Sequence, residues 1–176
     1  MNKKILNIIG ITILALGICG CGKKDEDKNP KLAQTYHKLC MAELSQDSDQ
    51  NTNPDASYRK ALEHIQESIN YCPTAETLAI KATLLFRLGY IKQSCSFFEM
   101  ALTHPATEKV KASILNNYGC ILAQMGQVDK ALKIFDQLEK NNDYFTPQAA
   151  LFNRGKIFFD KLDYQQAAQE FSKATK

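Results

Sequence analysis

The sequence predicts an all-α fold in which about four helical hairpins stack into a right-handed superhelix, a helical-hairpin solenoid. Two regularities support this prediction. Glycines beyond Gly22 occur at four positions only, and these form two pairs, Gly89 with Gly126 and Gly119 with Gly155, each separated by roughly one 34-residue hairpin. A small residue followed four positions later by an aromatic one recurs at a matching period, and no alternating β-branched stretch competes with helices. An unrelated helical bundle is the alternative.

The N-terminus predicts export. Lys3 and Lys4 precede an apolar run from Ile5 to Ile18, which is the pattern of a secretory signal peptide over residues 1–20. This run is shorter than the about 20 apolar residues that a membrane-spanning helix needs, and it ends at a polar stretch. We therefore expect cleavage rather than a transmembrane helix.

Cys21 is the predicted site of lipid attachment. The residues Ile18-Cys19-Gly20-Cys21 resemble the bacterial lipobox, in which a small residue precedes the modified cysteine. Cys19 fits less well because Ile18 would stand at the position of the small residue, and an ordinary cysteine behind a normal cleavage site is the alternative. The covalent lipid is the only cofactor we expect, and each buried methylene would add ~0.8 kcal/mol of membrane affinity. By resemblance to the sorting rule of Gram-negative lipoproteins, Gly22 favours the outer membrane, on its periplasmic face.

Residues 21–29 are expected to form the lipidated cysteine and a flexible spacer, because the stretch from Lys23 to Asn29 has no apolar residue. Loss of Lys3 and Lys4 with the signal peptide leaves nearly equal numbers of basic and acidic residues, without a basic stripe. The charge pattern therefore does not favour a nucleic-acid partner. Residues 30–176 suit one domain.

The first unit of that domain, residues 30–73, is irregular. We expect helices near residues 31–44 and 55–71, joined by a polar loop over residues 45–53, with Ala61, Ile65 and Ser68 as the buried stripe. The loop is long and lacks a turn glycine.

Three further units, residues 74–106, 111–146 and 147–176, share one pattern. In each, the first helix carries two apolar residues seven positions apart, and the second carries a small residue, an aromatic and a further core residue at helical spacing. The pairs in the first helices are Leu78/Leu85, Leu115/Leu122 and Leu151/Phe158. The sets in the second helices are Ser94/Phe98/Ala101, Ala131/Phe135/Leu138 and Ala167/Phe171/Ala174. Gly119 and Gly155 are expected to let the two helices approach closely, and Gly89 and Gly126 to end first helices in a left-handed turn.

These positions match the tetratricopeptide repeat, and residues 115–174 resemble a particular group of tetratricopeptide lipoproteins. The residues that carry the resemblance are Asn116-Asn117-Tyr118-Gly119, Gly126, Ala131, Phe135, Tyr144, Pro147, Asn153-Arg154-Gly155, Ala167 and Phe171. Their order is similar to that in the type IV pilus biogenesis lipoproteins, the pilotins of the PilF/PilW type. The resemblance implies a protein partner at the outer membrane, the pilus secretin or another pilus component. Family members usually carry more repeats than the four found here.

A general periplasmic adaptor that docks envelope enzymes such as peptidoglycan hydrolases is the alternative function, because the same repeat serves many partners. Catalysis is not expected: the sequence contains no glycine-rich phosphate loop and no nucleophile-elbow motif. We therefore expect neither an enzyme nor a small-molecule substrate.

The resemblance to tetratricopeptide stacks implies a partner-binding groove along the first helices. The residues at the groove positions are Ala79, Thr83 and Phe86, then Asn116, Cys120 and Ala123, then Phe152, Lys156 and Phe159. Phe86, Phe152 and Phe159 are the candidate anchors for a partner helix or strand. Burial of these aromatics by a further repeat, by a dimer partner or through a shifted register is the alternative.

The remaining cysteines and histidines predict no metal site. There is no C-x-x-C pair, and His37, His64 and His104 fall on different units. Cys95 and Cys120 could form a disulfide, because they lie on helices that we expect to be antiparallel neighbours in an oxidising compartment. Free thiols that act as small core residues are the alternative.

Overall fold

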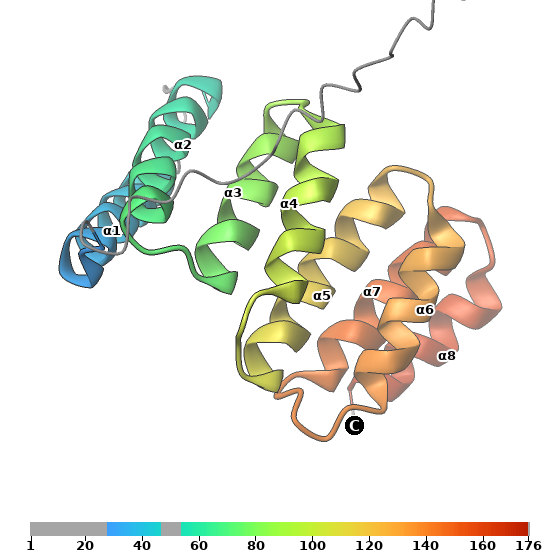
Figure 1. Ribbon diagram of the computed structural model, residues 1–176. Helices are drawn as coiled ribbons and strands as arrows, with labels where there is room; N and C mark the ends of the chain where they lie inside the picture. The colour runs from blue at the N-terminus through green and yellow to red at the C-terminus, as the bar shows by residue number, and fades with distance from the viewer. Residues whose placement is uncertain (1–27, 47–53, 176) are drawn as a thin grey trace, which may run out of the picture.

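The computed structural model describes residues 28–46 and 54–175, which form eight α-helices and no strand. The helices are α1 (Pro30–Gln46), α2 (Pro54–Tyr71), α3 (Ala75–Arg87), α4 (Ile91–Thr103), α5 (Glu108–Gln124), α6 (Val128–Glu139), α7 (Pro147–Asp160) and α8 (Tyr164–Ala174). They pair in chain order into four hairpins (Figure 1), so the predicted stack of helical hairpins is confirmed. The predicted signal peptide, Cys21, and most of the spacer and of the first loop lie outside the described residues.

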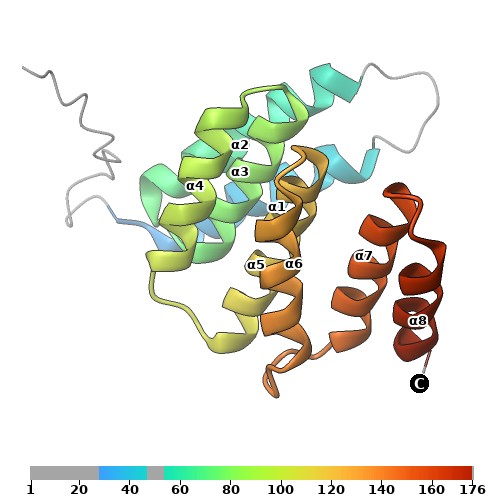
Figure 2. The same ribbon diagram turned by 90° about the vertical axis from the view of Figure 1, so that its right-hand side faces the viewer.

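Each hairpin after the first is joined to the preceding one by its first helix, which packs against the second helix of that preceding hairpin. Helix α5 packs against both α3 and α4, and α7 packs against both α5 and α6, while α3 packs against α2. In Figure 2 the third hairpin, α5 and α6, stands between the second, α3 and α4, and the fourth, α7 and α8. We call the side formed by α3, α5 and α7 the first-helix face, and the side formed by α2, α4, α6 and α8 the second-helix face.

Four of the eight helices begin after a side chain that accepts a backbone hydrogen bond. Thr74 forms a capping box at α3, and Thr107 and Asp163 accept from the third residue of α5 and α8. Asn29 accepts from the backbone of α1 at 3.0 Å. Thr146 precedes Pro147 at the start of α7 but makes no such bond, so the proline alone marks that boundary.

Three hairpins turn in the same way. Gly89 and Gly126 have φ values of +82° and +75°, as the sequence predicted, and the backbone N–H that follows each glycine donates to a carbonyl of the preceding helix at 2.8 Å. The last hairpin repeats this hydrogen bond, from Asp163 to Phe158 at 2.9 Å. Leu162 takes the place of the glycine there, with a φ of +65°. A branched side chain is therefore held in a conformation that normally favours glycine.

The other two glycines lie where helices touch. A Cβ on Gly119 would lie 3.0 Å from the ring of Phe135, and one on Gly155 would lie 2.7 Å from the ring of Phe171. Each aromatic ring thus rests directly on the backbone of the first helix of its hairpin. The close approach of the two helices that was expected at Gly119 and Gly155 is therefore confirmed.

The irregular first unit belongs to the same core. Cys40, Ala61 and Ile65 are fully buried together with residues of α3 and α4. The hydroxyl of Ser68 donates to the backbone carbonyl of Ala33 at 2.8 Å and so ties α2 to α1. None of the helices in the described part of the chain is long and apolar enough to cross a membrane.

We predict that Leu162→Gly stabilises the protein. Glycine relieves left-handed backbone strain of about 1–2 kcal/mol. It also increases the entropy of the unfolded chain, but this costs less, so the net gain in stability is a fraction of the strain energy. The midpoint temperature of thermal unfolding should therefore rise by about 2 °C.

The control is Leu162→Ala, which removes the exposed side chain but keeps a Cβ at positive φ. It should give no gain in unfolding temperature. An equal gain from both variants would show that the side chain, not the backbone conformation, is unfavourable.

Candidate functional site

The first-helix face carries three neighbouring hollows. The largest has a volume of about 510 Å³ and lies between α3 and α5, with residues of α1 and α2 at its edge. A smaller one of about 170 Å³ follows along α3 and α5, and a third of about 200 Å³ lies between α5 and α7. Neighbouring hollows share lining residues, namely Thr83, Arg87 and Asn117, and then Cys120 and Gln124. They therefore form one continuous channel, which we call the first-helix groove.

The largest hollow has apolar walls and a charged rim. Its apolar lining residues are Met41, Leu44, Tyr58, Ala79, Ile80, Leu84, Val110 and Ile114. Glu76, Arg87 and Lys109 add charges of both signs around the walls. Such a surface suits a polypeptide segment that buries apolar side chains and keeps polar ones at the edge.

Six of the nine predicted groove residues line this groove, namely Ala79, Thr83, Phe86, Cys120, Ala123 and Lys156. Phe86 is half-buried in the middle hollow, and Lys156 is exposed in the hollow between α5 and α7. Asn116 is half-buried beside them, and its amide oxygen accepts a hydrogen bond from Asn153 at 3.0 Å, which joins α5 to α7. Contact of these residues with a partner stays a prediction.

Phe152 and Phe159 lie elsewhere than we expected. Phe152 packs on Phe171, with ring centroids 5.3 Å apart, and Phe159 packs edge-on against Tyr164 at 5.5 Å. Neither lines a hollow of the groove, although both remain more than half exposed, at 54% and 53%. Residues 152, 156 and 159 share one stripe of α7 about 60° wide. Phe152 and Phe159 lie at its edge toward α8, whereas Lys156 lies at its edge toward α5.

The disulfide considered for Cys95 and Cys120 is absent, and both thiols are free. The sulfur of Cys95 contacts the sulfur of Met125 at 3.9 Å, whereas Cys120 lines the groove. The two helices are neighbours, but the two side chains leave them on different faces. Burial raises the pKa of the Cys120 thiol, and nearby Lys156 only partly opposes this. In the described ranges, no three histidine, cysteine or acidic side chains gather as a metal site would require.

Sequence reasoning missed a set of residues that link successive hairpins. Lys81, Tyr118 and Arg154 each stand immediately before the small residue of a first helix, Ala82, Gly119 and Gly155 respectively. Each contacts a polar residue of the preceding second helix, Gln66, Glu99 or Asp136 respectively. These three residues come directly after the core residues Ile65, Phe98 and Phe135. We call Lys81, Tyr118 and Arg154 the junction residues. Their signal in the sequence was a large polar side chain at a fixed place in each repeat.

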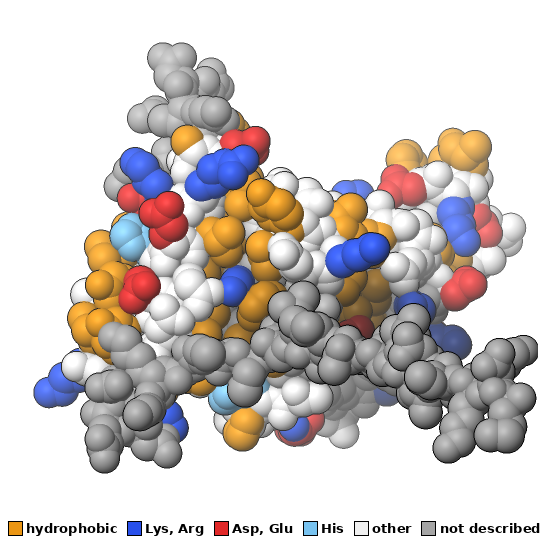
Figure 3. Space-filling model, turned by 45° about the horizontal axis from the view of Figure 1, so that its top comes forward, with side chains coloured by type: hydrophobic (Ala, Val, Ile, Leu, Met, Phe, Trp, Pro, Cys, Tyr) orange, Lys and Arg blue, Asp and Glu red, His pale blue; other side chains and the backbone are white. Residues whose placement is uncertain are grey.

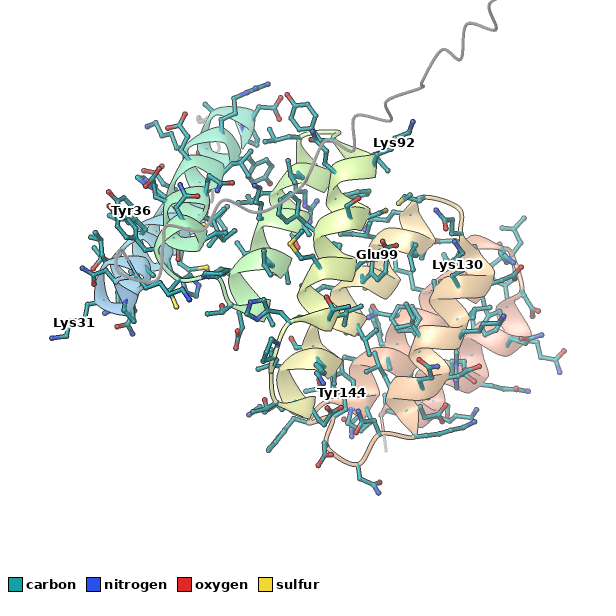
Figure 4. The ribbon with its side chains drawn as sticks, in the orientation of Figure 1. Lys31, Tyr36, Lys92, Glu99, Lys130 and Tyr144 are labelled. Carbon is teal, nitrogen blue, oxygen red and sulfur yellow. The ribbon has the colours of Figure 1, made fainter. Side chains whose placement is uncertain are left out.

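The junction between the second and third hairpins is neutral on the α5 side. The ring of Tyr118 stacks on that of Phe98, with centroids 5.0 Å apart. Glu99 projects from α4 toward α5 (Figure 4). Burial, together with the neighbouring Cys95 and Glu99, raises the pKa of Tyr118 to about 12, so its hydroxyl keeps its proton at neutral pH.

The junction between the third and fourth hairpins is an ion network. Arg154 is only 8% exposed and contacts three carboxylates on two helices: Asp136 and Glu139 of α6, the latter at 2.7 Å, and Glu170 of α8, through Nε at 2.6 Å. Lys173 adds a contact to Glu170 at 2.8 Å. Burial alone would raise the pKa of Glu170, but the hydrogen bonds from Lys173 and Arg154 hold it below its ordinary value.

A comparison with protein families finds a tetratricopeptide repeat model over residues 112–142. Together with the eight helices, this match places the fold among tetratricopeptide proteins, which act as scaffolds for protein interaction. A search of curated protein sequences gives no significant match.

Solved structures resemble the whole stack. PilW, described as a widely conserved type IV pilus biogenesis factor, matches with a TM-score of 0.66 and 19% identity over 83% of this chain and 62% of PilW. PilF of Pseudomonas aeruginosa matches with the same TM-score and identity over 82% of this chain and 60% of PilF. YrrB, a TPR protein with an unusual peptide-binding site, matches with a TM-score of 0.58 and 17% identity over 81% of this chain and 66% of YrrB. At these identities the likeness shows the fold, and the chain spans about three fifths of the length of the two pilus proteins.

We predict that Arg154→Met destabilises the protein by about 3 kcal/mol, because it leaves Glu170 buried without its main partner. The double variant Arg154→Met with Glu170→Leu should recover most of that loss, since it removes both charges. Chemical denaturation measures both values, and a double variant no more stable than the single one would contradict the assigned pairing.

We also predict a pH dependence. The pKa of Glu170 is lower in the folded chain than in the unfolded one, so its stabilisation is complete above an unfolded pKa of about 4.3 and is lost as pH falls through the folded value. Unfolding free energies measured between neutral and acid pH should fall less steeply for Glu170→Gln than for the wild type.

Proposed function

We propose that this chain is a lipid-anchored scaffold on the periplasmic face of the outer membrane, and that its first-helix groove binds a polypeptide of the type IV pilus assembly, the secretin or another pilus component. The continuous groove over α3, α5 and α7 is the observation that carries the proposal. Its apolar walls and charged rim suit a peptide segment. The likeness of the fold to PilW and PilF supports the choice of partner.

The lipid anchor rests on the sequence. The lipobox ending at Cys21 follows a signal-peptide pattern, and the polar residues after it would hold the folded domain away from the bilayer. Cells grown with labelled palmitate should incorporate it into the wild-type chain and not into Cys21→Ser. Labelling of both chains would contradict the assignment of Cys21.

We predict that filling the groove abolishes assembly of the partner. Asn117 is exposed and lines both the largest and the middle hollow, so Asn117→Trp would block the groove without disturbing the core. In a deletion strain of the native host, the wild-type gene should restore multimers of the pilus secretin, and Asn117→Trp should not.

The matched control is Gln137→Trp, which places the same side chain at an exposed position of α6 outside the groove. It should restore multimers as the wild type does. Restoration by Asn117→Trp would exclude the groove as the binding site. Normal multimers in the deletion strain would exclude the pilus role and favour an adaptor for other envelope proteins.

A further inference from the structure

A further cavity lies on the second-helix face. It is a cleft of about 720 Å³ between α2 and α4, with α3 as its floor. Leu62, Leu85, Phe97 and Met100 form apolar walls. Hydrophobic side chains gather over α2 to α4 in the space-filling view (Figure 3). This cleft is separate from the first-helix groove and shares no lining residue with it.

Lys81 rises from the floor of this cleft without a counter-charge. Its side chain is half-buried, its ammonium donates to the amide oxygen of Gln66, and it lies 4.1 Å from the centre of the Phe97 ring. No carboxylate in the described ranges forms an ion pair with it. Burial lowers the pKa of Lys81, as expected for a cation that gives up water without gaining an anion.

The equivalent position in the last hairpin shows what is missing. Arg154 is met by three carboxylates, at two positions of the preceding second helix and one position of its own second helix. The residues at these three positions around Lys81 are Gln66, Ile69 and Phe97. The backbone arrangement thus repeats, but each acidic side chain is replaced by an amide or an apolar group.

The other charges at the cleft do not replace them. Glu63 lines the cleft but is exposed and forms no ion pair with Lys81. Lys92 extends outward from the start of α4 (Figure 4) and adds a second positive charge at the rim. The cleft is therefore apolar with an excess of positive charge, which complements an anion attached to an apolar surface.

We propose that the cleft between α2 and α4 is a second docking site, and that it receives a helix of a partner protein whose apolar face carries one Asp or Glu, the carboxylate of which pairs with Lys81. The lining residues of α4 run from Lys92 to Met100, so the cleft is about 12 Å long and accommodates roughly two helical turns. A helix is the fitting occupant because the carboxylates that satisfy Arg154 in this same chain are also carried by helices that flank it.

The test uses the full chain and a display library of helical peptides. Each peptide has the same apolar stripe and one randomised position at its centre. Selection on the wild type should enrich Asp and Glu at that position. Selection on Lys81→Met, which keeps the apolar stem, should give no such enrichment. Lys133→Met removes an exposed charge of α6 outside both sites and should leave the enrichment unchanged.

A second variant supplies the missing carboxylate from within. Phe97 occupies the position that Glu170 has in the last hairpin. In Phe97→Glu the new carboxylate should pair with Lys81 and lower the affinity for the selected acidic peptide by about tenfold or more. Thermal unfolding of each variant checks that it is folded, and Lys81→Gln replaces Lys81→Met if the latter is not.

No enrichment on the wild type, or enrichment that survives Lys81→Met, would overturn the proposal. Dodecanoate bound as tightly as the acidic peptide would overturn it too, since the cleft would then take an aliphatic acid rather than a helix. Because Asn117 lies outside this cleft, Asn117→Trp should keep the peptide selection intact, so the two sites can fail independently.

Discussion

The contact of an aromatic ring with a bare helix backbone sets the geometry of the stack. Phe135 and Phe171 occupy space that a Cβ on Gly119 or Gly155 would take, and this fixes how closely the two helices of a hairpin lie. The junction residue comes immediately before the small residue, so it is turned by about 100° around the same helix. While the small residue faces its own second helix, its predecessor is directed toward the preceding hairpin. The intrahairpin contact and the interhairpin contact are thus two consequences of one helix rotation.

Much of this architecture follows from local spacing and was accessible from sequence. Ser94 and Phe98 lie four apart, and such pairs mark a buried helix stripe without knowledge of the partner helix. Even the unit without a turn glycine was predicted as a hairpin, because Ala61 and Ile65 carry the same stripe. The contact of Phe152 with α8 could not be predicted from the sequence. Periodicity shows which residues of α7 share a face, but not which neighbouring helix that face contacts. For the same reason, the sequence predicted that Cys95 and Cys120 lie on neighbouring helices but not which faces of those helices they occupy.

The last hairpin departs from the pattern at its turn. Leu162 is 71% exposed and has positive φ, so it is unfavourable both as an apolar group in water and as a backbone conformation. Tyr164 and Phe159 lie beside it and are also exposed. Between earlier hairpins, the corresponding side is covered by the next first helix, as α5 covers α4 and α7 covers α6. The side of α7 and α8 that faces away from the stack therefore keeps the apolar character of an internal repeat, rather than the polar surface of a capping one.

Three junctions with one geometry carry three different chemistries, and the difference decides what each can do. A neutral tyrosine holds its junction by ring stacking and depends little on pH. An arginine with several carboxylates holds its junction firmly but makes stability depend on the protonation of Glu170. Lys81 has no carboxylate, so the desolvation cost of its ammonium is offset only by an amide and a ring. An anion in the cleft would offset that desolvation cost, so the junction without a carboxylate is the one at which a carboxylate of a ligand has most to gain.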